Sequence, residues 1–397
     1  MDKKKRVIIA YPSMMIGGST TSLLSILNRL DYSKYDVDLL LNSHTGELLD
    51  KIPPQVNLLP PALRYTDKKK ELIHRLLSPR YLLHYAVSKF IIRRDKVAIH
   101  GPQYLEMKDV EFFREIPDIY DVAIAFLEGD RCKFVARHIN ANRKLAWIHI
   151  NYSDGKFEPK YDREAMSAFD RVALVSQDCK AAYDKAFPEL AERSLVVENI
   201  LSTEYVRSLA ADRVDFKTDK NKINLVTVCR ISFKSKGLDR AVVALSALKR
   251  ERLINNLVWY IIGNGDDYKK LQEMITAEGL QENIVLLGMQ NNPYKYMKYM
   301  DMFFLPSRWE GRPMAVTEAF MVGLPVLATE YSSAREQIQC YKDGIVVENS
   351  TDGIYKGLKA VAQGEISIQE MKGNVLANDY SNIEEIKKIE QLIDGDL

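Results

Sequence analysis

Two glutamates with seven residues between them, Glu310 and Glu318, are the first candidates for chemistry in the sequence. Pro313 suits the first turn of a helix that we predict to run to about Val322. A carboxylate accepts two hydrogen bonds, so each glutamate could hold a vicinal diol on a sugar ring or a ribose. The free N–H groups at the helix start between them suit a phosphate or sugar oxygen. The alternative is coincidence, because glutamate is common in helices and loops.

A second candidate is the pair of cations Arg230 and Lys236, which follows the apolar run at 224–229. Gly237 opens the next predicted helix. Two cations near a helix start suit a diphosphate, whose charge needs both Coulombic and hydrogen-bonding partners. A solvated basic loop is the alternative for this segment.

A third candidate is the pair Gly17 and Gly18, which follows the apolar run at 6–11. Two glycines at a helix start let backbone N–H groups approach an anion closely. The segment has neither the G-x-G-x-x-G spacing of a dinucleotide site nor the G-K-[ST] ending of a P-loop. From these residues alone, a plain strand–helix turn is the favoured interpretation.

The elements that must position these residues alternate along the whole chain. Short apolar, β-branched runs are followed by amphipathic helical patterns, which predicts parallel sheets with their chemistry in the loops after the strands. We predict an α/β fold of two doubly wound Rossmann-like domains facing each other across a cleft. A polar linker lies at 211–224. The predicted strands are 6–11, 36–42, 56–60, 121–127, 144–150 and 171–176, then 224–229, 257–263, 283–288, 302–307, 325–330 and 344–348.

Composition agrees with two globular domains. A chain of 397 residues with 46% hydrophobic and 28% charged residues is too long for one core and typical of a soluble protein. The first apolar run is too short for a signal peptide, and no run approaches the ~18 apolar residues of a membrane span. We therefore expect a cytoplasmic protein. Its four cysteines are scattered without metal-ligand spacing and are expected to be small buried residues, namely Cys132, Cys179, Cys229 and Cys340.

Three segments together carry a resemblance to a known family. In order and spacing, "RISFKSKGLDRAV", "GNGDDYKKLQ" and "SRWEGRPMAVTEAFMVGLPVLATEYSSAREQI" resemble the signature of retaining glycosyltransferases of family 4, which have the GT-B fold. In the first half, the Gly17-Gly18 loop, "LEG…WIHINYS" and "VVENI" are similar too. The resemblance covers nearly the whole chain and is sparse from about 60 to 118.

The resemblance implies that the second domain holds a nucleotide-sugar donor. Arg230 and Lys236 would then bind the diphosphate, and Glu318 the ribose of the nucleoside. Glu310 would bind hydroxyls of the donor sugar together with the backbone of the four residues that follow it, Gly311, Arg312, Pro313 and Met314. Asp266, where the family often has proline, and Cys229, where it usually has glycine, are departures that remove no charged ligand.

In the first domain the resemblance implies that Gly17 and Gly18 border the phosphates and that His149 approaches the sugar. For His149 alone, a satisfied core histidine is the commoner interpretation of the run "LAWIHI". The expected catalytic set is Glu310, His149, Lys236 and Arg230. No metal or other cofactor is expected, because the two cations and helix dipoles would stabilise the leaving diphosphate. Retention would follow from attack on the same face, assisted by the departing phosphate.

The implied organisation assigns acceptor binding to 1–200 and nucleotide-sugar binding to 201–375, with a C-terminal helix in 376–397 packing back towards the first domain. The implied activity moves a hexose or N-acetylhexosamine from a nucleotide sugar, expected to be UDP-linked, to a carbohydrate acceptor. A lipid-linked acceptor in surface polysaccharide assembly, such as capsule or exopolysaccharide, is expected. The alternatives are a GT-B sugar-nucleotide 2-epimerase, a glycoside hydrolase using Glu310 and Glu318, and a non-catalytic sugar-nucleotide-binding module.

Residues 68–96 stand out within an insertion at about 63–108. They hold nine Lys/Arg against Glu71 and Asp95, a local charge of +7 in a chain of +2. Leu, Tyr, Phe and Ile are interleaved at roughly helical spacing, which predicts a basic amphipathic helix at an anionic membrane surface, peripheral to the inner face of the plasma membrane. The alternative is a lid packed on the first domain. Nucleic acid is not favoured, because no binding motif accompanies the charge.

Overall fold

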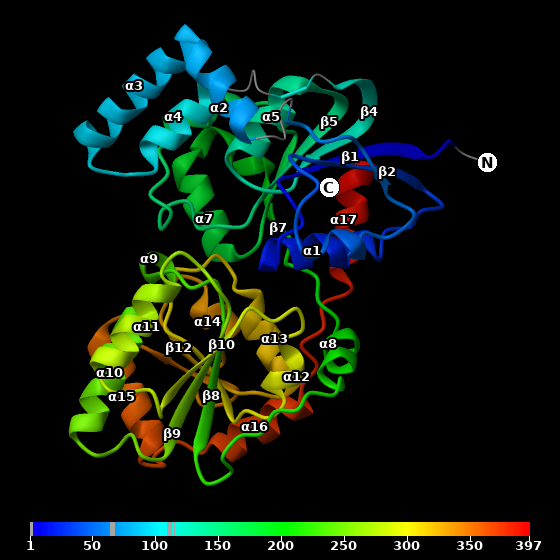
Figure 1. Cartoon of the computed structure of the whole chain (residues 1–397). Coiled ribbons are helices and arrows are strands. Elements are labelled where there is room, and N and C mark those ends of the chain that lie inside the picture. The colour runs from blue at the N-terminus through cyan, green and yellow to red at the C-terminus, as the bar shows by residue number, and fades with distance from the viewer. Residues whose placement is uncertain (1–2, 64–67, 109–112, 115) are drawn as a thin grey trace. The chain divides into compact units, whose positions relative to one another are not determined.

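The computed structural model describes residues 3–63, 68–108, 113–114 and 116–397, which form two compact units. The first unit comprises Met1–Asn199 together with Glu384–Leu397, and the second comprises Ile200–Ile383. Each unit is built on one sheet of parallel strands with helices packed against it (Figure 1). The predicted pair of doubly wound α/β sheets is confirmed.

The sheet of the first unit has the strand order β3-β2-β1-β4-β5-β6-β7. The strand β1, which lies between β2 and β4, is buried along Val7, Ile8 and Ile9, which explains the uninterrupted apolar run in the sequence. The strand β7 was not predicted, because its three residues are too few to form an apolar run. The strands are β1 (Lys5–Tyr11), β2 (Tyr35–Leu41), β3 (Asn57–Leu58), β4 (Ile116–Ala125), β5 (Ile139–Ile148), β6 (Arg171–Leu174) and β7 (Ser194–Val196).

Apart from α17, the helices of the first unit lie between successive strands in the chain. The short 3₁₀ turns η1 (Leu49–Lys51), η3 (Pro159–Tyr161) and η4 (Pro188–Arg193) lie among them. The α-helices are α1 (Gly18–Leu27), α2 (Lys68–Leu77), α3 (Pro79–Asp95), α4 (His100–Lys108), α5 (Asp130–His138), α6 (Arg163–Met166), α7 (Gln177–Ala186) and α17 (Glu385–Asp394).

The basic insertion forms three helices, α2, α3 and α4, instead of one amphipathic helix. Ser78 ends the first of them and caps the second, because its hydroxyl accepts a hydrogen bond from the Tyr81 N–H at 3.2 Å and Pro79 follows it. Most of the large apolar side chains on α2 and α3 face solvent, so the alternative of an apolar face packed on the domain is not what the structure shows. The exposed ones are Leu72, Ile73, Leu76, Leu77, Leu82, Leu83, Tyr85 and Phe90.

The helix α17 belongs to the first unit although it comes last in the chain. Asp394 forms an ion pair with Lys5 Nζ at 2.7 Å and accepts a hydrogen bond from the Tyr35 hydroxyl at 2.9 Å. Arg143 Nη1 donates to the Leu392 carbonyl at 2.8 Å. These contacts attach α17 to the strands β1, β2 and β5 (Figure 1).

The sheet of the second unit has the order β10-β9-β8-β11-β12-β13, and all six strands were predicted. Adjacent residues such as Leu225 and Val226 belong to different buried clusters, so helices cover both faces of the sheet. The strands are β8 (Ile223–Val228), β9 (Leu257–Ile262), β10 (Ile284–Gly288), β11 (Met302–Leu305), β12 (Val326–Thr329) and β13 (Gly344–Val347). The helices are α8 (Thr203–Ala210), α9 (Phe233–Lys236), α10 (Leu238–Arg250), α11 (Tyr268–Ala277), α12 (Tyr294–Met297), α13 (Met314–Val322), α14 (Ala334–Gln337), α15 (Thr351–Ala362) and α16 (Ile368–Ala377).

The cysteines differ from one another in burial. Cys132 and Cys179 are buried, Cys229 is half-buried, and Cys340 is exposed. The prediction of four buried cysteines was therefore wrong for Cys340, which lies in the surface turn between α14 and β13. Over the part of the chain that the structure describes, no helix combines the length and apolarity needed to cross a bilayer.

Candidate functional site

The predicted site residues of the second unit lie in the segments that follow β8 and β11, in the loops and in the helices α9 and α13. These two strands are neighbours, with Met302 paired to Leu225, so the loops that follow them leave the same edge of the sheet side by side. The loop after β8 leads into the short helix α9, which ends at Lys236. The loop after β11 carries Glu310 and leads into α13. Lys236 and Glu310, about seventy residues apart in sequence, thus bring opposite charges to the same edge of the sheet.

Lys236 and Glu310 form an ion pair there. Lys236 Nζ lies 2.5 Å from Glu310 Oε1, and the Ser307 hydroxyl donates to the same oxygen at 2.6 Å. The two charged side chains are only 22% and 10% exposed, so the pair is largely shielded from water. Both contacts use Oε1, and among the residues described here Oε2 of Glu310 has no protein partner. That oxygen is available to a ligand hydroxyl.

Glycine and arginine contacts hold the two loops together. Gly237 has φ +63°, and a Cβ there would lie 2.2 Å from the carbonyl oxygen of Pro306 in the neighbouring loop. The Arg308 N–H donates to the Ser235 carbonyl at 2.7 Å. The Arg308 guanidinium binds both carboxylate oxygens of Asp239, at 2.7 and 2.8 Å. Lys236 and Glu310 are therefore positioned by rigid backbone contacts as well as by their mutual attraction.

Glu318 lies inside α13 and is buried, with 8% exposure. Its Oε1 accepts a hydrogen bond from the Tyr294 hydroxyl at 3.0 Å. Burial raises the pKa of Glu318 to about 7, and the tyrosine hydrogen bond opposes this in part. A carboxylate with this pKa changes its ability to accept hydrogen bonds near neutral pH.

The start of α13 is held by side chains from α14. Pro313 is the N-cap residue, one position before the helical turn predicted for it. Its carbonyl accepts a hydrogen bond from Gln337 Nε2 at 2.9 Å, and the same nitrogen donates to the Thr317 hydroxyl at 2.8 Å. Arg312 Nη1 lies 4.0 Å from a Glu336 carboxylate oxygen. The residues Gly311 and Met314 complete this turn, Gly311 half-buried and Met314 buried.

Arg230 has the open environment expected of a ligand-binding cation. It is exposed, and within the described ranges no carboxylate pairs with it. The residues on either side of Arg230 pack closely against two glycines. A Cβ on Gly263 would lie 1.9 Å from the Cys229 carbonyl oxygen, and a Cβ on Gly265 would lie 2.2 Å from the Ile231 carbonyl oxygen. The Gly-x-Gly turn after β9 is thus required for close packing against the Arg230 loop, beyond reversing the chain direction.

In the first unit, Gly17 is the N-cap of α1 and Gly18 is its first residue. The Tyr11 hydroxyl at the end of β1 lies 2.7 Å from Ser19 Oγ and 3.0 Å from Thr20 Oγ1, which fixes the start of the helix. A Cβ on Gly17 would meet no atom within 4 Å. The glycine therefore leaves open space in front of the first turn of α1.

His149 follows β5 at the same edge of this sheet. Its backbone N–H donates to Glu128 Oε2 at 3.0 Å. Its ring contacts the Phe126 ring edge-on, with the centroids 5.0 Å apart. Both ring nitrogens are buried, and neither has a hydrogen-bond partner among the described residues. Burial lowers the pKa of His149 to about 3, so the ring is neutral at pH 7. It is not the satisfied core histidine of the alternative interpretation.

Glu128 is a residue at this edge that sequence reasoning did not single out. It follows β4 within the quoted "LEG", and a carboxylate immediately after a buried strand was the available signal. Burial raises the pKa of Glu128, opposed by the hydrogen bond from the His149 backbone. Ser307 and Tyr294 were also missed, because their roles depend on contacts across the fold.

The chain is similar to known proteins in sequence and in fold. Residues 210–375 match the family Glycosyl transferases group 1. This match covers most of the second unit, Ile200–Ile383. An uncharacterized glycosyltransferase of Methanocaldococcus jannaschii is 26% identical over 211 residues, covering 51% of each chain. A UDP-Gal:alpha-D-GlcNAc-diphosphoundecaprenol alpha-1,3-galactosyltransferase of Escherichia coli is 29% identical over 144 residues, covering 35% of this chain and 37% of the relative.

These alignments span about half, or about a third, of the curated relatives' own length. A solved structure with the whole architecture is that of Anabaena Alr3699/HepE in complex with UDP-glucose, with a TM-score of 0.68, 16% identity, and coverage of 98% of this chain and 100% of that one. At this identity the likeness concerns the fold. The chain has the GT-B fold, and Lys236, Glu310 and Glu318 lie within the segment that is similar to group 1 glycosyl transferases.

Proposed function

We propose that the protein is a retaining glycosyltransferase that moves a hexose or N-acetylhexosamine from a UDP-sugar to a lipid-linked carbohydrate acceptor. The observation that carries this is the Lys236–Glu310 pair inside a group 1 domain, at the strand ends where α/β folds bind ligands. The similar structure solved with UDP-glucose supports the choice of nucleotide. The relative that acts on a diphosphoundecaprenol-linked sugar supports the choice of acceptor.

The proposed donor site uses each charged group for one part of the nucleotide sugar. Lys236 and the unpaired Arg230 neutralise the diphosphate, and their charge stabilises it as it leaves, without a metal ion. The free Oε2 of Glu310 accepts a hydrogen bond from a hydroxyl of the donor sugar. Glu318, once ionised, accepts hydrogen bonds from the ribose diol.

The proposed acceptor chemistry uses the first unit. His149 is neutral, so its ring serves as a hydrogen-bond partner of the sugar and not as a cationic acid. The open turn at Gly17 and Gly18 borders the phosphates. The acceptor hydroxyl attacks the anomeric carbon from the face that the diphosphate leaves, and this retains the anomeric configuration. The departing phosphate takes the proton of the acceptor hydroxyl.

We also propose that the insertion docks on the inner face of the plasma membrane. Most of the large apolar side chains of α2 and α3 are exposed, as Leu83 and Phe90 illustrate with 63% each, and cations are interleaved with them in the sequence. An exposed apolar surface surrounded by positive charge suits an anionic bilayer, where a lipid-linked acceptor would be found.

The glycoside hydrolase alternative is not favoured by the geometry. One oxygen of Glu310 is held by Lys236 and Ser307, and Glu318 is buried and bonded to Tyr294. A hydrolase would have no use for Arg230 or Lys236. An epimerase would need acid and base groups facing the sugar, and the two ring nitrogens of neutral His149 do not supply such a pair.

A panel of UDP-, GDP-, ADP- and dTDP-sugars tests the proposal by thermal shift, because a ligand that binds only the folded state raises the melting temperature. A UDP-sugar should give the largest rise, and the same sugar should then appear on a diphosphate-linked acceptor with its anomeric configuration retained. No response to any nucleotide sugar, or cleavage of simple glycosides without nucleotide, would contradict the proposal.

A further inference from the structure

The first unit contains a second group of cations, at the opposite edge of its sheet from His149. Arg171 is the first residue of β6, and Arg193 directly precedes β7. Arg143 lies in the neighbouring strand β5, two residues before the Leu145 that pairs with Arg171. Because the strands are parallel, their amino-terminal ends bring the three side chains to one edge of the sheet.

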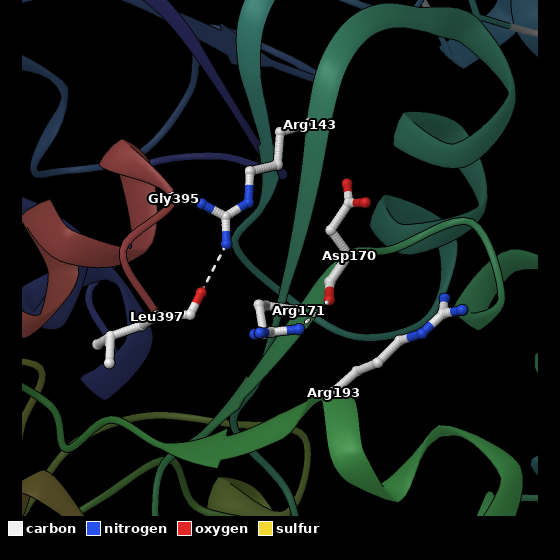
Figure 2. Close-up of a pocket in the computed structure, with 6 residues that line it drawn as sticks. All are labelled: Arg143, Asp170, Arg171, Arg193, Gly395 and Leu397. Atoms are coloured by element: carbon white, nitrogen blue, oxygen red, sulfur yellow. Dashed lines mark hydrogen bonds between the residues drawn. The ribbon is translucent and has the colours of Figure 1, made fainter.

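These arginines line a pocket of about 490 Å³ whose other lining residues are Asp170, Gly395 and Leu397. Figure 2 shows the side chains of Arg143 and Arg171 reaching towards the segment that follows α17, whereas the Arg193 side chain points away from it. The pocket is therefore bounded on one side by the sheet and on the other by the end of the helix that returns to this unit.

The guanidinium groups contact main-chain oxygens and leave several donors unused. Arg143 donates to the Leu392 and Leu397 carbonyls at 2.8 and 2.7 Å, and Arg171 donates to the Asp170 carbonyl at 3.2 Å. Arg193 Nη1 donates to two carbonyl oxygens, at 3.1 and 3.0 Å. Each guanidinium has five N–H donors, so most of them remain available.

The positive charge of this group is not balanced by ion pairing. In the described part of the chain, none of the three guanidinium groups has an Asp or Glu carboxylate within ion-pair distance, and Arg143 donates to a main-chain oxygen of Leu397. Asp170 is the acidic residue lining the pocket, and its Oδ2 accepts the Lys144 N–H at 2.7 Å. Burial lowers the pKa of Arg143, and repulsion from Arg171 lowers it further, whereas attraction to Asp170 and Asp396 opposes the shift in part. An anion between them would relieve this repulsion.

We propose that this pocket binds a small soluble phosphate-bearing anion, held by the guanidinium groups of Arg171 and Arg143. Planar guanidinium groups match the oxygens of a phosphate and bind it with two hydrogen bonds each. The site is separate from the proposed donor site, which lies in the other unit. Because Arg143 also holds the carbonyls of Leu392 and Leu397, a bound anion strengthens the attachment of α17 to the first unit.

Inorganic phosphate and inorganic diphosphate are the probes, with sodium chloride at the same ionic strength as the reference. Phosphate should raise the melting temperature above the chloride reference and should slow hydrogen exchange at the α17 amides. In Arg171→Gln the dissociation constant for phosphate should rise about tenfold or more, the loss expected for one charge-assisted contact. Arg171→Lys keeps the positive charge but not the planar guanidinium, so its dissociation constant for phosphate should lie between those of the wild type and Arg171→Gln.

Three comparisons separate this site from other causes. Arg250→Gln removes an exposed arginine of α10 and should leave the phosphate response unchanged. In Lys236→Ala phosphate should still slow hydrogen exchange at the α17 amides, because phosphate bound at the proposed donor site would not protect α17. Equal responses to phosphate and chloride, or an undiminished response in Arg171→Gln, would overturn the proposal. Loss of binding to anionic vesicles in Arg171→Gln, with no response to free phosphate, would assign the pocket to a lipid headgroup and overturn the soluble-anion assignment.

Discussion

Lys236 Nζ lies 2.5 Å from Glu310 Oε1, although 74 positions of sequence separate the two residues. The contact joins the loops after two neighbouring strands and leaves the second carboxylate oxygen of Glu310 unpaired. In the proposed donor site, this contact links Glu310, which is proposed to bind the sugar, to Lys236, which is proposed to bind the diphosphate. Each residue is therefore expected to matter for transfer even where the other is intact.

Lys236→Ala and Glu310→Gln should each reduce transfer at least about 100-fold, because each removes a charge or hydrogen bond that acts on the donor. Both residues lie at a helix end or in a loop, so the proteins should remain folded. Circular dichroism and a transfer assay measure the two effects. Lys234→Ala is the matched control, since Lys234 is an exposed lysine of the same short helix. Near-normal turnover in either variant would contradict the assignment.

Glu318 should make nucleotide affinity depend on pH around its pKa of about 7. The ionised form accepts both hydrogen bonds of a diol, so UDP should bind more tightly as pH rises from 6 to 8. Isothermal titration calorimetry measures this trend, and Glu318→Gln should flatten it. An unchanged slope in the variant would show that another group titrates.

The same carboxyl group should lower stability as pH rises. Between about pH 4.5 and 7 the folded state keeps the proton that the unfolded state has lost, so the free energy of unfolding falls across this window. A shift of this size corresponds to roughly 3 kcal/mol once both states are ionised. Urea unfolding at pH 5 and pH 8 should show the fall in the wild type and a smaller one in Glu318→Gln.

His149 should contribute in the opposite sense. The pKa of the buried ring is about 3 in the folded state, so the unfolded state binds a proton first as pH falls below about 6.5. Stability is then lost from pH 6.5 downwards, by roughly 3 kcal/mol at pH 4. His149→Phe should be less sensitive to acid in urea unfolding while its UDP affinity stays unchanged. Equal acid sensitivity of the two proteins would show that the ring is not the group responsible.

Membrane binding through the insertion should be salt-dependent. Raising salt from 0.1 M to 1 M shortens the Debye length from ~10 Å to ~3 Å, so sedimentation with anionic vesicles should weaken and binding to neutral vesicles should be poor throughout. Changing Lys68, Lys69, Lys70, Arg93 and Arg94 to Ser should reduce vesicle binding and leave UDP-sugar affinity intact.

Leu83→Ser with Phe90→Ser is the complementary variant, because it keeps the charges and removes two exposed apolar side chains. It should bind anionic vesicles more weakly at 1 M salt, where the apolar contribution dominates. Sedimentation of the wild type and both variants to the same extent would refute membrane docking by this segment.

Transfer should continue in excess chelator, because Arg230 and Lys236 are proposed to supply the positive charge that a divalent ion supplies elsewhere. Activity measured with and without EDTA, in protein freed of metal beforehand, should be equal. Complete loss of activity that Mg²⁺ restores would contradict the roles proposed for both cations.

The sequence predicted the strands that carry the second unit because their apolar runs are buried on both faces. The sequence also placed Glu310 before α13 and Glu318 within it, because glycine and proline mark where the loop ends and the helix begins. It could not predict the Lys236–Glu310 contact or the Tyr294–Glu318 hydrogen bond, which depend on strand order. Nor did it show that the apolar residues of the insertion remain exposed, because helical spacing does not reveal what a helix face contacts.

The return of α17 to the first unit has a consequence for synthesis on the ribosome. Residues 200–383 are contiguous, so the second unit can fold as soon as they have emerged. The first unit begins earlier in the chain but lacks Ile389, Leu392 and Ile393, which are buried in its finished core, until the codons for α17 have been translated. The part made first is thus the part completed last, and a nascent chain stalled before residue 385 would leave an apolar surface on the first unit for chaperones to cover.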